Sequence, residues 1–486
     1  PDALLYEEAD ERFRIEVERT RSGFFLLLNI ASHTASEVRY LQADQPTAEF
    51  QLVAPREDNH EYYADHHPGP LAGPSGGIFY IRTNSGGRTF RLVTVPMADP
   101  RREYWREAIP NRPGVMLAAA EVFQSHLVLF EREDGLPCLR IVDLNSVVRN
   151  ALAASHRIEF TEPAYNASIG ENPEFNASHV RFQYESFITP RSIFDYDIHS
   201  RERILRKQQP VLGGYDSSQY LSERFHATAS DGTRVPLSVV YRRDTPRDGS
   251  APLLLYGYGS YGISVPVNFS SNRLSLLNRG VIYAVAHVRG GGELGKPWHD
   301  AGRMKQKRNT FTDFIAAAEH LIAHRYTTSE KIVIEGGSAG GLLMGAVTNM
   351  RPDLFRIVIS HVPFVDVLNT MLDASLPLTV GEYEEWGNPQ IADDYFYMKS
   401  YCPYTNLERR DYPALLLKTG LNDSQVMYWE PAKYVAKLRT LKTDSNALLL
   451  KTNMGAGHGG ASGRYDYLRE IALDYAFLLA RFGIYK

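Results

Sequence analysis

The chain has few cysteines, no long apolar run and little excess of either charge. Its 486 residues include only two cysteines, Cys138 and Cys402. Two cysteines cannot form the disulfide framework of a secreted domain, so we expect two buried thiols and a cytoplasmic location. No run of about 18 apolar residues occurs, which predicts that no segment spans a membrane. The first residues also lack the basic and then apolar pattern of a leader.

The charged residues exclude several further classes of protein. The net charge is −4, with acidic and basic residues mixed along the sequence, so we expect no nucleic-acid partner. Residues 289–293 are rich in glycine but lack the Lys-Ser/Thr pair of a phosphate-binding loop. His320 and His324 are four residues apart, but Leu321 stands where a zinc-peptidase helix has Glu. We therefore predict neither a metal nor a cofactor.

Short apolar segments repeat through the first part of the chain. Four pairs of strand-like runs, each pair joined by polar turn residues, occupy 24–28 and 38–41, 78–81 and 90–93, 127–130 and 139–142, and 180–184 and 193–196. Successive pairs begin about 50 residues apart, a period that is typical of propeller blades. A plain β-sandwich with chance regularity is the alternative. We predict that residues 1–211 form an incomplete β-propeller of about four blades.

After residue 211 strand-like runs alternate with helical ones. The apolar runs are 253–256, 281–285, 332–334, 414–417 and 447–450, and residues 310–324 have apolar positions at helical spacing. Short, continuously apolar strands suit a parallel sheet that is covered on both faces. This alternation predicts a doubly wound, mostly parallel α/β domain at 212–486, and a chain of this length is too long for one ordinary core.

One motif in the second domain predicts a catalytic nucleophile. Residues 336–340, Gly-Gly-Ser-Ala-Gly, match G-x-S-x-G, with a strand-like run before them and a helical run after them. Such a sharp strand-to-helix turn exposes the serine hydroxyl, and it needs small neighbours because the backbones crowd there. The helix N-terminus also favours a developing anion. Ser338 is therefore the predicted nucleophile of an α/β-hydrolase, and an ordinary glycine-rich turn is the alternative.

A serine nucleophile needs a base and a group that orients the base. In α/β-hydrolases these follow the serine in the order acid, then histidine. Asp423 follows the strand-like run 415–420, and His458 follows the run that ends at residue 450. Both positions lie at the carboxyl ends of strands, where open α/β sheets form their sites. We predict that neutral His458 takes the proton of Ser338 and that Asp423 holds the imidazole in the right tautomer.

The oxygen that becomes negative during acyl transfer needs hydrogen-bond donors. The backbone N–H of Ala339, next to the nucleophile, is one of them. A second donor comes from a loop after an earlier strand, and residues 256–262, Tyr-Gly-Tyr-Gly-Ser-Tyr-Gly, follow such a strand. These residues alone do not choose among Tyr256, Tyr258 and Tyr261.

Four segments together point to a known family. They are 256–262, 287–295, the turn at Ser338, and 381–389, which reads Gly-Glu-Tyr-Glu-Glu-Trp-Gly-Asn-Pro. Across essentially the whole chain the sequence resembles the oligopeptidase B branch of the prolyl oligopeptidase family of serine peptidases. The resemblance implies a β-propeller that caps an α/β-hydrolase domain and an active site at their interface. It also implies cleavage of peptides, rather than folded proteins, after Arg or Lys.

The resemblance further implies roles for single residues. The family's nucleophile, acid, base and oxyanion tyrosine fall on Ser338, Asp423, His458 and Tyr258. Its two acidic specificity residues fall on Glu382 and Glu384, and carboxylates in a partly desolvated pocket favour a cationic side chain. Without the resemblance, this acidic cluster is most simply a solvated loop.

The sequence departs from the family pattern at three positions. Pro266 and Asn268 stand where bacterial members often have two aspartates that suit a basic residue before the cleaved one, so paired basic residues are not the expected preference. Gln425 stands where prolyl oligopeptidase itself has arginine, which favours the oligopeptidase B branch. Relatives begin further upstream, so we expect this chain to be a fragment and its missing N-terminal segment to be a partner.

The predicted function is hydrolysis of short basic peptides after Arg or Lys through an acyl-enzyme intermediate. One alternative is a catalytically impaired fragment in which the incomplete propeller acts as a binding module. Another is an acylaminoacyl peptidase or esterase, against which the acidic pair argues.

Overall fold

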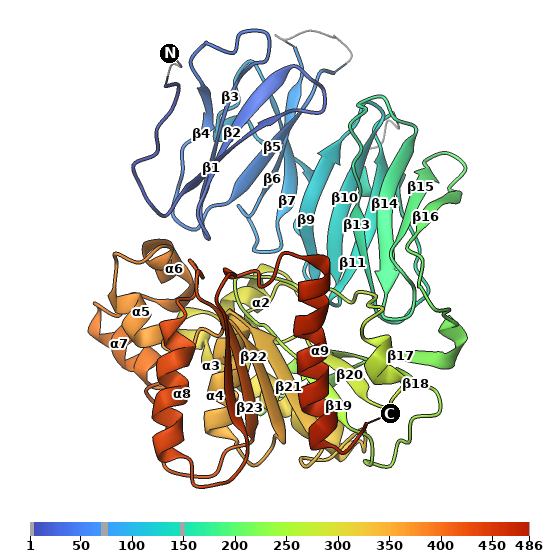
Figure 1. The fold of residues 1–486 in the computed structure, drawn as a ribbon. Helices are drawn as coiled ribbons and strands as arrows, with labels where there is room; N and C mark the ends of the chain where they lie inside the picture. Colours follow the sequence, from blue (N-terminus) through green and yellow to red (C-terminus); the bar gives the residue numbers. More distant parts are fainter. Residues whose placement is uncertain (1–3, 70–75, 146–150, 486) are drawn as a thin grey trace.

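The computed structural model of the chain describes residues 4–69, 76–145 and 151–485. Its N-terminal part consists of four four-stranded sheets, and its C-terminal part has one eight-stranded sheet with helices on both faces (Figure 1). The predicted combination of β-propeller blades with a doubly wound, mostly parallel sheet is confirmed. Among the described residues, no helix combines the length and the apolar character needed to cross a membrane.

Each small sheet is an antiparallel meander whose strands pair in chain order. The first two sheets contain β1 (Arg14–Arg19), β2 (Phe25–Ala31), β3 (Ser36–Gln42) and β4 (Gln51–Ala54), then β5 (Tyr62–His67), β6 (Ile78–Thr83), β7 (Arg91–Pro96) and β8 (Arg106–Ile109). The next two contain β9 (Val115–Val122), β10 (His126–Glu133), β11 (Leu136–Asp143) and β12 (Ser155–Arg157), then β13 (Tyr165–Ile169), β14 (His179–Ser186), β15 (Ser192–Asp197) and β16 (Arg203–Gln208). Two short 3-10 helices accompany them, η1 (Arg102–Tyr104) and η2 (Ala151–Ala154).

The strand pairs predicted from the sequence are the two middle strands of each small sheet. The predicted runs correspond to β2 and β3, β6 and β7, β10 and β11, and β14 and β15. Successive sheets share apolar cores, as in the cluster that joins Phe25 and Leu27 to Phe79 and Ile81. Each sheet therefore stacks on its neighbour, as blades of a propeller do.

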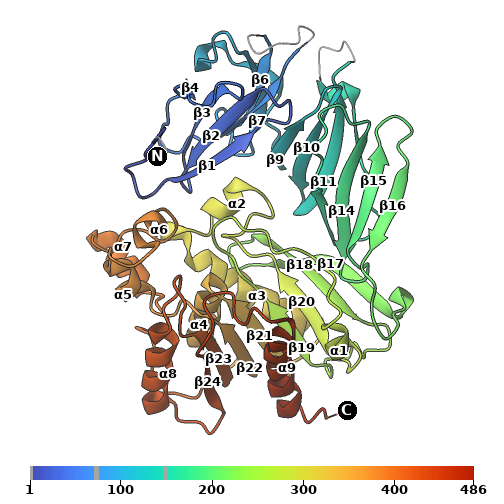
Figure 2. The same cartoon turned by 45° about the horizontal axis from the view of Figure 1, so that its top comes forward.

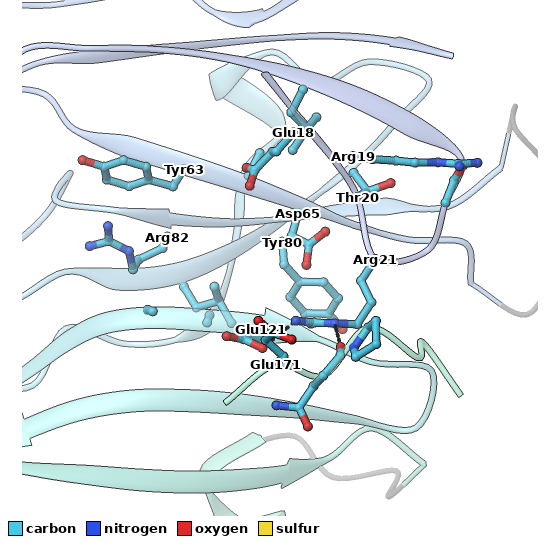
Figure 3. Close-up of a pocket in the computed structure, with 18 of the residues that line it drawn as sticks. Glu18, Arg19, Thr20, Arg21, Tyr63, Asp65, Tyr80, Arg82, Glu121 and Glu171 are labelled. Carbon is cyan, nitrogen blue, oxygen red and sulfur yellow. Dashed lines mark hydrogen bonds and ion pairs between the residues drawn. The ribbon is translucent and has the colours of Figure 1, made fainter. Parts of the chain in front are cut away.

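A cavity of about 960 Å³ lies between the first strands of three of these sheets, β1, β5 and β9. Figure 3 shows Arg21 extended towards Glu121, with which it forms an ion pair of 2.5 Å. The Nε atom of Arg21 also donates to the carbonyl oxygen of Asn172 at 2.7 Å. The described residues that line this cavity include none of the predicted site residues, so it lies apart from the predicted active site.

The large sheet has the order β17-β18-β20-β19-β21-β22-β23-β24. Its strands are β17 (Tyr220–Thr228), β18 (Arg234–Arg242), β19 (Leu253–Tyr256), β20 (Ile282–Ala286), β21 (Ile332–Gly337), β22 (Ile357–His361), β23 (Ala414–Gly420) and β24 (Leu448–Asn453). The β17–β18 and β18–β20 pairs are antiparallel and the others are parallel. The carboxyl ends of β21, β22, β23 and β24 therefore point the same way, and the predicted site residues follow three of them.

Helices cover both faces of this sheet. They are α1 (Leu274–Leu277), α2 (Lys296–Asp300), α3 (Arg308–Ala323), α4 (Ala339–Met350), α5 (Val367–Leu372), α6 (Thr379–Trp386), α7 (Ala392–Lys399), α8 (Trp429–Leu441) and α9 (Arg464–Arg481), with the 3-10 helices η3 (Ser217–Gln219) and η4 (Met304–Gln306). On β21, Ile332 and Ile334 pack in the core with α3 and α4, whereas Val333 packs in the core with α9. Burial on both faces explains why the central strands are continuously apolar.

The blades and the hydrolase part contact each other directly. Lys296 Nζ donates to the carbonyl oxygen of His33 at 3.1 Å, and Arg88 pairs with Asp300 at 2.5 Å. Figure 2 shows β1 on the side of the blades that faces α2 and α6. The predicted boundary between residues 211 and 212 falls in the segment between β16 and β17. The β1 end of the blades thus lies over the edge of the sheet where the predicted site is.

Glu131 on β10 provides a test of how the third small sheet is held together. Its side chain is fully buried and pairs with Arg112, with Arg140 at 3.0 Å and with Arg157 at 3.2 Å. Burial opposes the charge of Glu131, but the arginines outweigh burial and lower its pKa. We expect Glu131→Gln to reduce the free energy of unfolding by about 3 kcal/mol, because loss of one partner leaves the other charges uncompensated. Calorimetry measures this loss, with the more exposed Glu133→Gln as control; equal losses in both variants would argue against it.

Candidate active site

Ser338 lies at the turn between β21 and α4, as the sequence predicts. Its backbone has φ 56° and ψ −120°, a conformation that a residue other than glycine keeps only when its surroundings impose it. A Cβ atom on Gly336 would lie 2.6 Å from the carbonyl oxygen of Gly340. The turn therefore requires glycine two residues before the serine.

Asp423 and His458 meet at the carboxyl ends of β23 and β24. Nδ1 of His458 donates to the Asp423 carboxylate, with distances of 2.8 and 3.0 Å to its two oxygens. Oδ1 of Asp423 also accepts the backbone N–H groups of Gln425 and Val426, each at 2.9 Å. Burial opposes the charge of Asp423, but these hydrogen bonds outweigh burial and lower its pKa. The carboxylate thus stays charged and fixes the tautomer that leaves Nε2 of His458 free to accept a proton.

Ser338 and His458 line different cavities. Ser338 lines a cavity of about 310 Å³, and His458 lines one of about 350 Å³. Within the described part of the chain, the hydrogen bonds of the His458 ring are those with Asp423, and none reaches Ser338. Catalytic hydrogen bonds often tighten only when substrate binds, and Gly457 and Gly459 give the His458 loop conformational freedom. The role of the three residues as one triad stays a prediction.

The structure distinguishes among the three candidate tyrosines. Tyr258 lines the same cavity as Ser338. Tyr256 lines the cavity of His458 instead, and the hydroxyl of Tyr261 donates to Oε2 of Glu382 at 2.5 Å. Tyr261 lines the Ser338 cavity as well, but its hydroxyl is bonded to Glu382. The role of Tyr258 as the oxyanion donor stays a prediction.

Two donors thus lie beside the nucleophile. Ala339 is the first residue of α4, so its N–H has no acceptor within the helix. Burial raises the pKa of Tyr258 to about 12, and the charges of Glu382 and Glu385 act in the same direction. A hydroxyl with a raised pKa keeps its proton at neutral pH. Tyr258 can therefore donate a hydrogen bond to a developing oxyanion.

Glu382 lies in the Ser338 cavity, on α6. Its Oε2 atom accepts hydrogen bonds from the Tyr261 hydroxyl and from Nε1 of Trp386, each at 2.5 Å. Burial raises the pKa of Glu382, and these two donors act against that rise. Arg14 of β1 lines the same cavity, and its charge also favours the ionised form of Glu382. The cavity therefore contains a carboxylate on the hydrolase side and a cation that the blades supply.

Glu384 lies elsewhere, although it is only two residues from Glu382. Its carboxylate accepts from Ser32 Oγ at 3.4 Å and lies 3.7 Å from Arg12, so it faces the blades. Successive residues of an α-helix turn by about 100°, so side chains two apart point in nearly opposite directions. Of the described residues, Glu384 is not among those that line the Ser338 cavity. Its role in specificity stays a prediction.

A buried set of charged side chains supports the loop that carries Tyr258. Glu385 accepts the backbone N–H of Tyr261 at 3.0 Å and lies 2.6 Å from Nε2 of His299. Lys307 Nζ donates to the carbonyl oxygen of Gly259 at 2.6 Å. Sequence reasoning missed these residues, because nothing in their spacing indicates that α2, α6 and the start of α3 meet under one loop.

Arg14 and His33 were also not predicted. Both come from the blades and line the Ser338 cavity. The ring of His33 stacks on that of Tyr261 with centroids 5.8 Å apart. No motif surrounds either residue, so only the packing of the two domains could identify them.

Together these features define an α/β-hydrolase whose candidate site lies beneath stacked β-sheets. The sequence pattern "Prolyl oligopeptidase family" matches residues 267–484, and the pattern "Prolyl oligopeptidase, N-terminal beta-propeller domain" matches residues 1–209. The chain is 44% identical over 485 residues to dipeptidyl aminopeptidase BI of Pseudoxanthomonas mexicana, covering 99% of this chain and 65% of that protein. It is 42% identical over 483 residues to protease 2 of Moraxella lacunata, covering 99% of this chain and 67% of that protein. The chain belongs to the prolyl oligopeptidase family.

Solved structures agree with this assignment. Oligopeptidase B from Leishmania major superposes with a TM-score of 0.93 and 38% identity, over 99% of this chain and 67% of that one. Oligopeptidase B from Trypanosoma brucei superposes with a TM-score of 0.94 and 41% identity, over 99% of this chain and 68% of that one. The chain thus spans about two thirds of the length of these relatives.

Tyr258 provides a test of the oxyanion site. We expect Tyr258→Phe to reduce kcat by about 10²–10³-fold, because one donor to the developing oxyanion is lost. KM changes much less, because the donor acts mainly in the transition state. Steady-state kinetics measure both constants. Tyr434→Phe on α8 is the control, because its buried hydroxyl has no hydrogen-bond partner in the described part of the chain. A Tyr258→Phe variant as active as this control would contradict the assignment.

Proposed function

We propose that this chain forms the catalytic part of a serine oligopeptidase that hydrolyses short peptides on the carboxyl side of Arg or Lys. The observation that carries the proposal is the position of Glu382, whose carboxylate lines the same cavity as Ser338 and Tyr258. The oligopeptidase B of Trypanosoma brucei, one of its structural relatives, has covalently bound antipain. Membership of the family supports a serine nucleophile, and the partly buried carboxylate of Glu382 supports a cationic substrate side chain.

The reaction proceeds by acyl transfer in two halves. His458 accepts the hydroxyl proton of Ser338 while the serine oxygen attacks the peptide carbonyl carbon, and the carbonyl oxygen becomes negative. The Tyr258 hydroxyl and the Ala339 N–H stabilise this oxygen. The C–N bond then breaks as His458 returns the proton to the leaving amine. A water molecule, activated by the same histidine, releases the acyl group and restores Ser338.

Specificity follows from the charge and the surroundings of Glu382. Its carboxylate has low exposure to water and a raised pKa, so a cation placed against it favours ionisation strongly. A planar guanidinium suits a carboxylate in such a cavity better than a neutral side chain does. Arg14 lies in the same cavity, so a substrate arginine replaces or joins a cation that is already there.

The same proposal includes the size of the substrate and the location of the protein. The blades face the site and contact α2 and α6, so they restrict entry to short, flexible peptides. Cys138 and Cys402 are free thiols, and Cys402 is buried, which supports the proposed cytoplasmic location.

Covalent labelling tests the nucleophile. We expect the chain to react with a fluorescent phosphonate and to hydrolyse a short peptide that ends in an arginyl reporter group. Ser338→Ala should lose both properties, because the attacking oxygen is removed. A folded chain that neither reacts nor turns over substrate would instead favour the alternative of a non-catalytic binding module.

Substitution of the two glutamates tests the proposed specificity. We expect Glu382→Gln to lower kcat/KM for an arginyl substrate by about ten- to a hundredfold, because a hydrogen bond to a charged group contributes about 1.5–3 kcal/mol. The value for a matched substrate with a neutral side chain should change little. Glu384→Gln, which alters a carboxylate that faces the blades, is the matched comparison. An unchanged preference for arginine in Glu382→Gln would refute the pocket assignment.

A further inference from the structure

A cluster of four charged side chains lies on β21, the strand that leads to Ser338, and on the neighbouring elements β22, β23 and α9. His361 at the end of β22 has its Nε2 atom 3.1 Å from Glu335 of β21 and 3.8 Å from Asp474 of α9. Lys418 of β23 pairs with Asp474 at 2.9 Å. All four residues line the cavity of about 350 Å³ that His458 also lines. None of them takes part in the acyl-transfer steps described above.

The backbone of His361 holds the nucleophile turn. The N–H of Ser338 donates to the carbonyl oxygen of His361 at 2.8 Å, and the N–H of Phe364 donates to the carbonyl oxygen of Ser338 at 3.1 Å. Hydrogen bonds to His361, the last residue of β22, and to Phe364, which follows it, thus hold the N–H and the carbonyl oxygen of Ser338. We call these two hydrogen bonds the clamp.

The clamping segment is itself strained. Val362, the residue after His361, has φ 37°, a value that a β-branched residue adopts only under constraint. Its N–H donates to the carbonyl oxygen of Lys418 at 2.7 Å. Two residues with positive φ, Ser338 and Val362, are therefore linked through His361, and such strain persists only where side-chain and backbone contacts fix the geometry.

The charges of the cluster balance only when His361 carries a proton. These four side chains then comprise two cations and two carboxylates, whereas with neutral His361 the two carboxylates face one cation, Lys418, in a partly buried place. Burial opposes the charged ring, but the hydrogen bond to Glu335 and the charges of Glu335 and Asp474 outweigh burial and raise the pKa of His361. Because this pKa lies above the ordinary histidine value of 6.5, the ring of His361 stays protonated to a higher pH than a free histidine does. The interactions of the protonated ring are lost as pH rises through the raised pKa.

We propose that His361 is a positioning residue for Ser338: its protonated ring, held by Glu335 and Asp474, fixes the carbonyl oxygen that binds the Ser338 N–H. Loss of the ring proton loosens the clamp and reduces the reactivity of the nucleophile. The proposal rests on the proposed role of Ser338 and adds a second histidine, besides His458, to the site. The titratable and charged groups that face the cluster include, on the sheet, Tyr256 of β19, Tyr283 of β20, Glu335 of β21 and Lys418 of β23. They also include His458 before α9, and Tyr467, Glu470, Asp474 and Tyr475 of α9.

The pH dependence of phosphonate labelling of the full chain tests the proposal. The rate of labelling measures the reactivity of Ser338 and does not depend on binding of an arginine or lysine side chain. In the unchanged chain the labelling rate should fall at alkaline pH as His361 loses its proton. His361→Gln should label about ten- to a hundredfold more slowly at neutral pH, since small misplacements of a reacting group have effects of this size. It should also lack the alkaline fall.

A second variant separates positioning from loss of structure. Glu335→Gln removes a carboxylate that favours the His361 cation, so the alkaline fall should move to lower pH while labelling at low pH is kept. His320→Gln on α3, where the ring stacks on His324 away from the cluster, is the control and should leave the profile unchanged. Circular dichroism checks that each variant is folded.

The outcomes distinguish the two proposals. No labelling of the unchanged chain would refute the proposed function itself. Labelling of the unchanged chain with the same rate and the same pH profile in His361→Gln would overturn the role of His361. An alkaline fall that does not move in Glu335→Gln would also overturn it, since the charge cluster would then not control the clamp.

Discussion

The site depends on one constraint, the strained backbone of Ser338 between β21 and α4. Its positive φ belongs to a sharp strand-to-helix turn, in which a serine hydroxyl is exposed and the next residue, here Ala339, provides a backbone N–H. The conformation persists because backbone hydrogen bonds to His361 and Phe364 hold the turn on both sides. The apolar cores on both faces of the sheet in turn fix β21 and β22, so the packing of the domain supports the geometry of a single residue.

Buried charge organises the rest of the site. Glu385 anchors the loop that carries Tyr258, and the cluster around His361 lies on the other side of the nucleophile strand. Burying charged groups is costly unless they are paired and hydrogen-bonded, and these groups are both. Glu382 differs, because it has neutral donors but no cation within ion-pair distance among the described residues. That difference distinguishes a carboxylate available to a ligand from one that serves the fold.

Sequence reasoning found the middle strands of every blade and missed the outer ones. Of the outer strands, β1 and β16 expose all their residues and therefore show no apolar pattern. The outer strands β5, β9 and β13 contain buried apolar residues, and sequence reasoning missed them as well. It also predicted the turn at Ser338 and the residues Asp423 and His458, whose side chains the structure joins. It treated Glu382 and Glu384 alike, because the sequence alone did not show that they lie on a helix, where their side chains point apart.

The sequence by itself determined the features that depend on local pattern: the strand periodicity, the G-x-S-x-G turn, and the order of acid and histidine after it. These follow from the backbone conformations that short segments prefer and from the fixed direction of parallel strands. Only the tertiary structure decided which tyrosines and which glutamate line the Ser338 cavity, that Arg14 lines it too, and that the backbone of His361 binds the Ser338 N–H. Those relations depend on contacts between segments that are far apart in the sequence, and their distances are fixed by packing.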